Sequence, residues 1–454
     1  MQKIAKIFKN LIRGIIYMKK FLGLLLMIVM VLSLVACGGE KQKPVSQGES
    51  NQKTSKELDQ TKDPASEDTD LQPEEGAELL VWESEGPELE WLKEIAEEFE
   101  SKYGIKVNIE AVGAVDAEER LAQDGPAGVG ADIFAAPHDH LGSLIAAGLV
   151  QPNTNTGERI KNEFMDAAYS AVEYQGTVYG YPTAIETYAL FYNKDVFPEA
   201  PKTYDEIIAK AEEFNDPNTN KYVFMWDIQN AYYSHSFIAN GGGYVFGQGG
   251  TDKNDIGLDN EGAIVGAKDM LKLKDILPVN SSDSTTQIIE GLFDEGKVGA
   301  IIDGPWAVQG RKDAGLNFGV APLPKMSNGE QQPSFSGIRV LWVSAYTKYP
   351  NAAKLFLDFV ISDEALLRRF ELTSQIPPVK ALAEANEIKN DEFVVPFLEQ
   401  AEYAVPMPSI PQVQYMWDPY GAAFGSMWND GIVPEEALKK AADAMRDSIV
   451  AEEE

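Results

Sequence analysis

Short apolar runs alternate with a longer amphipathic run at the start of the patterned part of this chain. Residues 78–82, 105–109 and 132–136 have the length and composition of strands. Residues 90–102 carry apolar side chains at helical spacing, and Gly104 follows as a stop signal. Because strands separated by helices pair in parallel through crossover connections, this order predicts an α/β fold.

In the remainder of the chain, predicted helices and strands also alternate. Residues 203–214 are predicted as a helix, since a Thr and a Glu three residues apart open it as a capping box. Residues 223–226 and 299–306 are predicted as strands, the second of them ending in a Gly-Pro turn. Residues 335–344 are interpreted as a strand that returns from a second lobe to the first. With 454 residues, the chain is long enough for two lobes with separate cores.

Residues 173–194 form an aromatic and β-branched stretch with a single carboxylate in its second half. Gln175-Gly176 is the turn signal of a hairpin in the first half. Glu186 stands among apolar neighbours, where an unsatisfied charge costs several kcal/mol. It could lie on a solvated strand face or pair with a basic residue, and the hydroxyl groups of a neutral ligand would satisfy it equally well.

Carboxylates and aromatic residues gather at the predicted strand ends, where ligands of open α/β sheets bind. This pairing suits a carbohydrate, because the apolar faces of a sugar ring stack on aromatic rings and carboxylates accept hydrogen bonds from hydroxyls. Other tryptophans lie inside periodic segments and are assigned to the core: Trp91, Trp226, Trp342 and Trp428. The candidate ligand-binding residues are Trp82, Glu110, Asp139, Glu186, Tyr232, Tyr233, Trp306 and Trp417.

The N-terminal region predicts export and an anchor. Lys19 and its neighbour precede a short apolar run, so residues 1–37 have the organisation of a signal peptide, with Met18 as an alternative start. The Leu-Val-Ala-Cys ending at Cys37 resembles a bacterial lipobox, in which this cysteine would be lipidated. The alternative is an uncleaved anchor with an incidental cysteine. Residues 38–77 are polar and lack aromatic residues, which predicts a flexible tether.

The charge balance argues against a nucleic-acid partner. The chain has 39 Lys and Arg against 71 Asp and Glu, a net charge of −32 that would repel phosphates. No metal or cofactor site is predicted, because His138, Asp139 and His140 are adjacent and only His235 remains elsewhere.

Three carboxylates stand in recognisable motifs. Residues 181–194, with Glu186, are similar to the first crossing between the lobes of maltose/maltodextrin-binding proteins of ABC transporters. Glu110 after its strand and Asp139 in a His-Asp pair resemble the sugar-contacting carboxylates of the same family. The likeness runs from about residue 79 to the C-terminus.

Aromatic motifs extend the resemblance. Tyr232 stands where the family has a stacking tyrosine, and the Asp-Gly-Pro-Trp sequence at 303–306 resembles an Asn-Gly-Pro-Trp turn that presents a stacking tryptophan. Residues 410–417 resemble the run that brings a further tryptophan into the cleft. The chain departs from the family in the loop at 83–88, which has no lysine, and at His140, where an arginine is common.

The resemblance implies a two-lobed, type II periplasmic-binding-protein-like fold with hinge crossings. Residues 78–185 and 337–395 would form lobe 1, and residues 186–336 and 396–454 would form lobe 2. It implies a monomeric lipoprotein, anchored to the cell membrane on its extracytoplasmic side, that binds maltose or maltodextrins and delivers them to the permease subunits of an ABC transporter. No catalytic residue and no cofactor is implied.

Other functions are open at this point. The same binding module could take another neutral oligosaccharide. A secreted glycoside hydrolase would also use paired carboxylates, flanking one glycosidic bond. A sugar-sensing or adhesive lipoprotein without a permease is a third alternative.

Overall fold

The computed structural model describes residues 71–453. The predicted signal peptide, Cys37 and residues 38–70 of the predicted tether lie outside this range. Among the described residues, no helix combines the length and the apolar character needed to cross a membrane.

The first sheet has six strands. In spatial order they are β2 (Lys106–Ala111), β1 (Glu78–Glu83), β3 (Ile133–Pro137), β12 (Phe335–Val343) and β13 (Val405–Pro406), with β6 (Tyr181–Thr187) also paired to β12. β1 pairs in parallel with β2 and β3, which confirms the prediction from the alternating pattern. β12 runs antiparallel to both β3 and β6.

The second sheet has four strands, in the order β11 (Phe318–Ala321), β7 (Ala189–Asn193), β10 (Val298–Asp303) and β8 (Tyr222–Met225). β7 is antiparallel to its two neighbours, whereas β10 and β8 are parallel. β6 and β7 follow one another in the chain and belong to different sheets, so the chain passes from the first sheet to the second at Thr187 and Tyr188.

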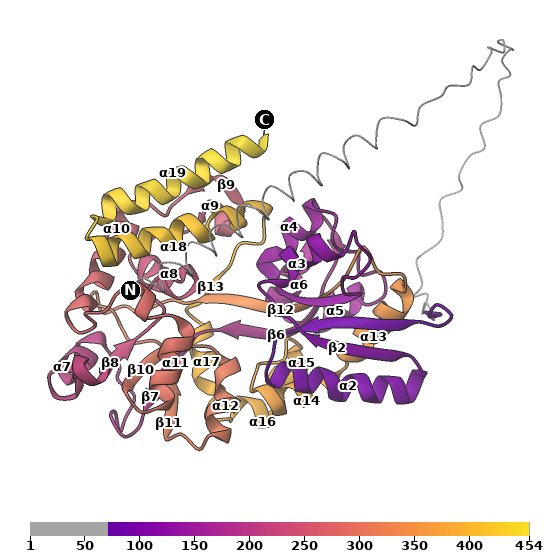
Figure 1. Cartoon of the computed structure of the whole chain (residues 1–454), viewed down its shortest axis with the longest axis horizontal. Helices are drawn as coiled ribbons and strands as arrows, with labels where there is room; N and C mark the ends of the chain where they lie inside the picture. Colours follow the sequence, from indigo (N-terminus) through magenta and orange to yellow (C-terminus); the bar gives the residue numbers. More distant parts are fainter. Residues whose placement is uncertain (1–70, 454) are drawn as a thin grey trace, which may run out of the picture. The chain divides into compact units, whose positions relative to one another are not determined.

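Helices cover both sheets (Figure 1). Those around the first sheet include α2 (Pro87–Tyr103), α13 (Pro350–Val360) and α14 (Asp363–Thr373). Those around the second include α7 (Tyr204–Phe214), α8 (Ala231–Asn240), α10 (Glu261–Leu271), α11 (Thr286–Asp294), α18 (Trp417–Gly425) and α19 (Pro434–Glu453). The predicted cap of α7 is confirmed, since the Glu206 N–H donates to Thr203 Oγ1 at 3.2 Å.

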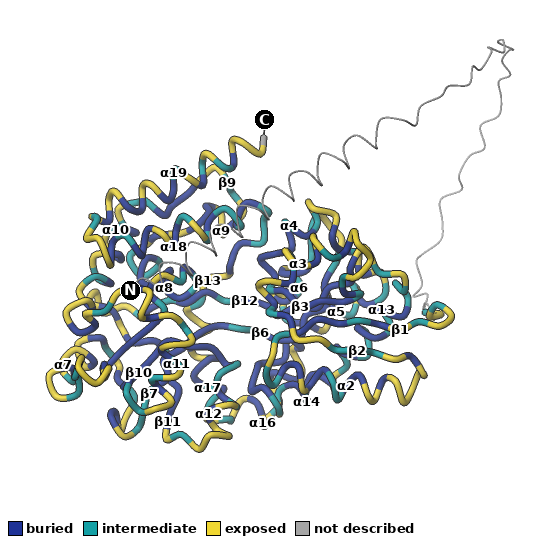
Figure 2. The backbone as a smooth tube through the Cα atoms, in the orientation of Figure 1, coloured by how far each residue is buried: buried dark blue, intermediate teal, exposed yellow. Residues whose placement is uncertain are grey.

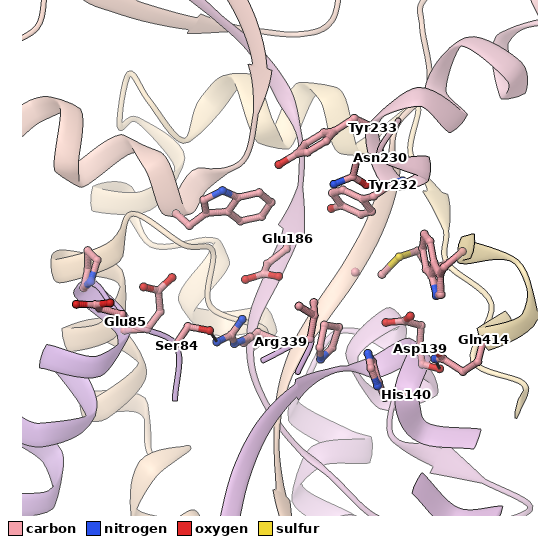
Figure 3. Close-up of a pocket in the computed structure, with 18 residues that line it drawn as sticks. Ser84, Glu85, Asp139, His140, Glu186, Asn230, Tyr232, Tyr233, Arg339 and Gln414 are labelled. Atoms are coloured by element: carbon pink, nitrogen blue, oxygen red, sulfur yellow. Dashed lines mark hydrogen bonds between the residues drawn. The ribbon is translucent and has the colours of Figure 1, made fainter. Parts of the chain in front are cut away.

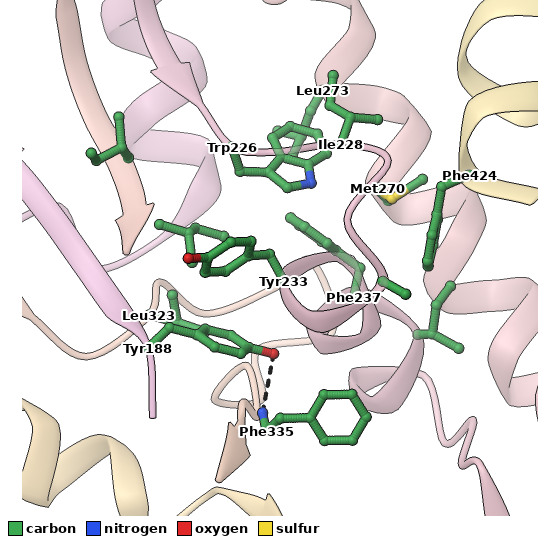
Figure 4. Packing of buried hydrophobic residues seen from close by; sticks show 14 of the residues in the cluster. Tyr188, Trp226, Ile228, Tyr233, Phe237, Met270, Leu273, Leu323, Phe335 and Phe424 are labelled. Carbon is green, nitrogen blue, oxygen red and sulfur yellow. Dashed lines mark hydrogen bonds between the residues drawn. The ribbon is translucent and has the colours of Figure 1, made fainter. Parts of the chain in front are cut away.

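The buried apolar residues form two clusters, each made of side chains from one sheet and from the helices around it. Figure 2 shows the buried stretches of backbone in both parts. The first contains Trp91 and Trp342, and the second contains Trp226 and Trp428. All four are fully buried, which confirms their assignment to the core. Figure 4 shows part of the second cluster, where the Tyr188 hydroxyl accepts a hydrogen bond from the Phe335 N–H at 3.1 Å. We propose that each sheet with its cluster is one lobe.

The two clusters locate the passages between the lobes. Phe335 packs in the second cluster and Ile338 in the first, so β12 is the second passage. We propose that the third passage lies earlier than the expected boundary at residue 395. Ile388 and Val394 were placed in lobe 1 from the sequence, but both pack in the second cluster. The apolar pattern of this segment predicts that these residues are buried. It does not predict in which of the two cores they pack.

The end of the predicted tether lies against the folded part. Glu74 accepts hydrogen bonds from the N–H groups of Asn351 and Ala352, at 2.9 and 3.1 Å, and thereby caps the start of α13. The Asn351 side chain donates to the Gln72 carbonyl at 3.0 Å. The segment predicted to be a flexible tether up to residue 77 is therefore held in place from Gln72 onward.

Candidate ligand-binding site

A pocket with a volume of about 620 Å³ is lined by residues of the first sheet and by turns and helices that pack around the second sheet (Figure 3). Its volume falls within the range of about 300–1,000 Å³ that is usual for small-molecule sites. The passages between the lobes contribute Glu186, Gly337 and Arg339 to the lining. The remaining lining residues come from loops and helix starts near strand ends, as the position of ligand sites in α/β sheets predicts.

Most of the candidate ligand-binding residues border this pocket. They are Asp139, Glu186, Tyr232, Tyr233, Trp306 and Trp417. Trp82 and Glu110, which were also predicted to contact a ligand, are not among the lining residues.

Trp82 and Glu110 contact each other. They are register partners on β1 and β2, so their side chains share one face of the sheet. Trp82 Nε1 donates to Glu110 Oε2 at 3.3 Å, and the Arg120 guanidinium lies 4.4 Å from the centre of the indole ring. Trp82 is fully buried in this arrangement. The next residue, Glu83, points to the opposite face, as strand alternation requires, and interacts with Arg339.

One wall of the pocket is aromatic. Tyr232 and Tyr233 lie in the first turn of α8, which the Asn230 side chain caps by accepting from the Tyr232 N–H at 3.0 Å. The Tyr188 ring supports both tyrosines edge-on, at 4.9 and 5.4 Å between ring centres. Trp417 opens α18 and packs against the second cluster. Such a wall offers flat apolar faces to a ligand.

Trp306 reaches the same wall from the turn after β10. Its indole ring lies over Gly304, so closely that a side chain at this position would collide with the ring. Asp303 holds the turn, because its carboxylate accepts from the Gly304 N–H and from Arg311 Nη1, both at 2.8 Å. The family motif has an asparagine here, and the buried ion pair with Arg311 balances the charge that the aspartate adds.

The carboxyl group of Glu290 lies close to Asp303 of this turn. Burial, together with the charge of Asp303, raises the pKa of Glu290 to about 7, against the opposing effect of Arg311. The two carboxyl groups are hydrogen-bonded to each other, which requires a proton on one of them. No motif or periodic pattern in the sequence points to Glu290.

Another wall of the pocket is polar and joins the two lobes. Asp139 and His140 lie in a 3-10 turn after β3, and His140 Nδ1 is 2.5 Å from Glu118 Oε2. Gln414 Nε2, from the other lobe, donates to the Asp139 carbonyl at 3.3 Å. Hydrogen-bonding groups from both lobes therefore border the same space.

His138 connects three parts of the molecule. Its Nδ1 accepts from the Ile338 N–H of β12 at 3.2 Å, so the proton of the neutral ring belongs on Nε2, which donates to the Met407 carbonyl at 3.1 Å. Burial lowers the pKa of His138 and keeps this neutral form. The histidine acts as a structural link beneath the pocket.

The base of the pocket carries charged residues that were not among the candidates predicted from the sequence. Arg339 on β12 donates to Glu83 and, at 2.7 Å, to Ser84 Oγ. Glu88 at the start of α2 and Arg369 on α14 complete this cluster around Glu186. An arginine inside the apolar run of residues 335–344 was the signal that could have drawn attention to Arg339.

The described residues contain no group of three or more His, Cys, Asp and Glu side chains placed to hold a metal ion. The side chains that line the pocket provide aromatic faces, carboxylates, amides, an imidazole and a guanidinium group. Stacking and hydrogen bonding of a neutral polyhydroxylated ligand use all of these.

The chain is similar in sequence to known solute-binding proteins. The family model described as bacterial extracellular solute-binding protein matches residues 94–394. A galactooligosaccharide-binding protein of Bacillus subtilis is 33% identical over 384 residues, which cover 83% of this chain and 90% of the relative. A maltooligosaccharide ABC transporter solute-binding lipoprotein of Streptococcus pneumoniae serotype 4 is 31% identical over 420 residues, covering 91% of this chain and 92% of the relative.

Solved structures with the same architecture contain maltooligosaccharides. A cyclo/maltodextrin-binding protein complexed with maltotetraose has a TM-score of 0.69 and 39% identity, with 82% of this chain and 97% of that chain covered. MalX from Streptococcus pneumoniae in complex with maltopentaose has a TM-score of 0.76 and 31% identity, with 82% and 100% covered.

Proposed function

Because this chain belongs to the family of bacterial extracellular solute-binding proteins, we propose that it binds maltose and maltodextrins outside the cytoplasm and delivers them to an ABC permease. The family membership confirms the resemblance noted from the motifs. The two-lobed, type II periplasmic-binding-protein-like fold predicted from the sequence is confirmed by the solved structures that share it.

One observation carries the choice of ligand. The pocket sets an aromatic wall, with Trp306 and Tyr232, beside carboxylates that include Glu186 and Asp139. The glucose units of an α-1,4 glucan have apolar faces for the rings and hydroxyl groups for the carboxylates. Relatives named for maltooligosaccharides and structures containing maltotetraose and maltopentaose support this assignment.

Binding would close the two lobes around the sugar. The chain passes between the lobes at β6, at β12 and near residues 376–388, and these passages would serve as the hinge. Closure hides the ligand from water and forms a surface that a permease can recognise, so the affinities for sugar and permease are linked.

The carboxylates act as hydrogen-bond acceptors in this proposal and not as an acid and base pair. The family and the names of the relatives support a binding role without catalysis. We expect no hydrolysis product when the protein is incubated with a glucan.

The anchor is a separate part of the proposal. A lipid on Cys37 would hold the mature protein at the outer side of the cell membrane as a monomer. The name of the S. pneumoniae relative, a solute-binding lipoprotein, supports the lipid anchor. The substitution Cys37→Ala should release the protein into the medium, as measured by fractionation. Retention at the membrane would instead favour an uncleaved anchor.

Galactooligosaccharides are the second candidate ligand, because a relative with 33% identity is named for binding them. Galactose differs from glucose in the orientation of one hydroxyl group. The aromatic wall would accept either sugar, and the carboxylates would distinguish them through hydrogen-bond geometry.

Tryptophan fluorescence provides the test. The mature chain should be titrated with maltose, maltotriose, maltotetraose and a galactooligosaccharide, and each mixture should be kept overnight for product analysis. A saturable change that favours the α-1,4 glucans, without products, is the expected result. A preference for galactooligosaccharides would assign the second ligand class, and product formation would contradict the binding role.

A further inference from the structure

Gln375 lies in the third passage between the lobes, close to the ligand pocket. The residue follows the left-handed Ser374 that ends α14, where φ is 57°. The next residue, Ile376, accepts a hydrogen bond from the Ile185 N–H at 2.8 Å, so this segment runs beside β6. The fully buried Gln375 side chain is thereby brought to the neighbouring Glu186.

The amide of Gln375 connects two carboxylates. Its Nε2 donates to Glu88 Oε1 at 2.9 Å and to Glu186 Oε1 at 3.1 Å. Its Oε1 accepts from Arg369 Nη2 at 2.5 Å. Because a guanidinium group can only donate, Arg369 fixes the orientation of the amide and directs both amide hydrogens to the carboxylates.

The surroundings explain why a neutral donor is needed here. Three carboxyl groups and two guanidinium groups meet here, so the carboxyl groups outnumber the guanidinium groups by one. Glu186 is half-buried, and the other members of the cluster are buried. Burial raises the pKa values of Glu186 and Glu88, although the charges of Arg339 and Arg369 oppose this change. The titratable and charged groups that face Glu186 are Glu83 of β1, Glu88 of α2, Tyr232 of α8, Arg339 of β12 and Arg369 of α14.

We propose that Gln375 is a positioning residue of the ligand site, which holds the Glu186 carboxylate through one oxygen and directs the group into the pocket. Figure 3 shows Glu186 pointing into the pocket next to Arg339. The proposal rests on the proposed function, in which Glu186 accepts hydrogen bonds from sugar hydroxyls. It also places residues of all three passages in one cluster: Glu186 from the first, Arg339 from the second and Gln375 from the third.

The substitution Gln375→Glu tests this role through pH. It keeps the shape and the contact with Arg369 but replaces the donor by a carboxylate that faces Glu88 and Glu186. The dissociation constant for maltotetraose at about pH 8 should rise by roughly tenfold or more. Lowering the pH to about 5.5 should recover much of this loss, because the introduced carboxyl group then carries a proton that it can donate. Gln375→Met, which has no donor at any pH, should not recover in this way.

Gln400→Glu is the matched control. Gln400 is also a fully buried glutamine, which donates to the Gln332 carbonyl and to Ser334 Oγ at 3.0 and 3.1 Å, and it does not border the pocket. This substitution should lower the melting temperature without a pH-dependent change in affinity. An unchanged affinity of Gln375→Glu at about pH 8, or a loss that is the same at every pH, would overturn the positioning role.

A second measurement does not depend on the identity of the sugar. The carboxyl carbon of Glu186 can be followed by NMR during pH titration of the ligand-free protein, with Glu186→Gln used to assign its signal. Gln375→Met should raise the pKa of Glu186, because a donor to the ionised form is lost. An unchanged Glu186 titration would overturn the inference. Failure of wild type to bind any glucan would contradict the proposed function alone.

Discussion

The turn after β10 holds the indole ring of Trp306 against the pocket. The side chain is partly buried. It lies over Gly304 and also packs against the second cluster. A ring held in this way loses little conformational freedom when it stacks on a sugar, so its stacking energy adds directly to affinity.

We expect Trp306→Ala to weaken maltotetraose binding by about 1–3 kcal/mol, which is about 5–150-fold in the dissociation constant. Isothermal titration calorimetry measures the change. Tyr403→Ala removes an aromatic side chain that is 48% exposed and outside the pocket, and its affinity should equal that of wild type. Equal affinity of the Trp306 variant and wild type would exclude the stacking role.

The raised pKa of Glu290 should make the stability of the protein depend on pH. Its pKa of about 7 in the folded protein exceeds the ordinary value of 4.5, because burial and Asp303 favour the protonated form. The folded state therefore keeps a proton that the unfolded chain releases, and the free energy of unfolding from this group should fall as pH rises from about 4.5 to about 7. Above that interval its contribution is constant.

The substitution Glu290→Gln mimics the protonated form. It should stabilise the protein by about 1–3 kcal/mol at about pH 8 and have little effect at about pH 4.5. Urea unfolding at both pH values provides the measurement, with Glu399→Gln on the exposed surface of α17 (Val395–Ala401) as the control. A difference that does not change with pH would contradict the assignment of the shared proton.

At the scale of secondary structure, the turn after β10 acts as a small rigid unit. The strand ends at Asp303, which binds both the Gly304 N–H and Arg311, and Pro305 begins the next helical turn. Pro305 restricts the backbone and Gly304 leaves space for the indole ring. The position of Trp306 is therefore a property of the whole turn.

Gly304→Ala should displace the indole ring, because the added methyl group would occupy the space of its ring atoms. The loss of maltotetraose affinity should approach that of Trp306→Ala, at about 1–3 kcal/mol. Gly310→Ala is the control, since nothing lies within 4 Å of a side chain at that helical position. It should leave affinity unchanged and stabilise the protein by about 0.5–1 kcal/mol. Wild-type affinity in the Gly304 variant would show that the ring can shift without loss of binding.

At the scale of the whole folded part, the lobes touch along one side of the pocket. His138 and Asp139 of lobe 1 are hydrogen-bonded to Met407 and Gln414, and Gly142 packs directly on Pro411. Because there is no space for a side chain at Gly142, this contact depends on its glycine. Contacts between lobes contribute to the balance between open and closed forms.

Gly142→Ala should separate the lobes at this contact and favour an open form. We expect a loss of about 1–3 kcal/mol in sugar affinity and a larger radius of gyration in small-angle X-ray scattering. Gly157→Ala in the same lobe is the control, because its added methyl group would meet Val178 at an ordinary 3.5 Å. Reduced stability with an unchanged dissociation constant would show that the contact is the same in open and closed forms.

Local sequence patterns were enough to predict most helices and strands and much of the pocket wall. The spacing of apolar residues in a strand or helix reflects which of its faces is buried. The alternation of these spacings over residues 78–136 therefore predicted the parallel pairing of the first three strands. Residues at strand ends, such as Asp139 and Trp306, could be placed near a ligand because the carboxyl ends of strands meet in one crevice.

Which side chains contact one another could be seen only in the folded chain. Trp82 and Glu110 stand at strand ends like the other candidates, yet they pair with each other beneath Arg120. Gln375 lies 189 residues from Glu186 and 287 from Glu88, and its local sequence gives no sign of either contact. Local patterns specify how much of a segment is buried, whereas the partner of a buried polar group depends on distant segments that only the folded chain brings together.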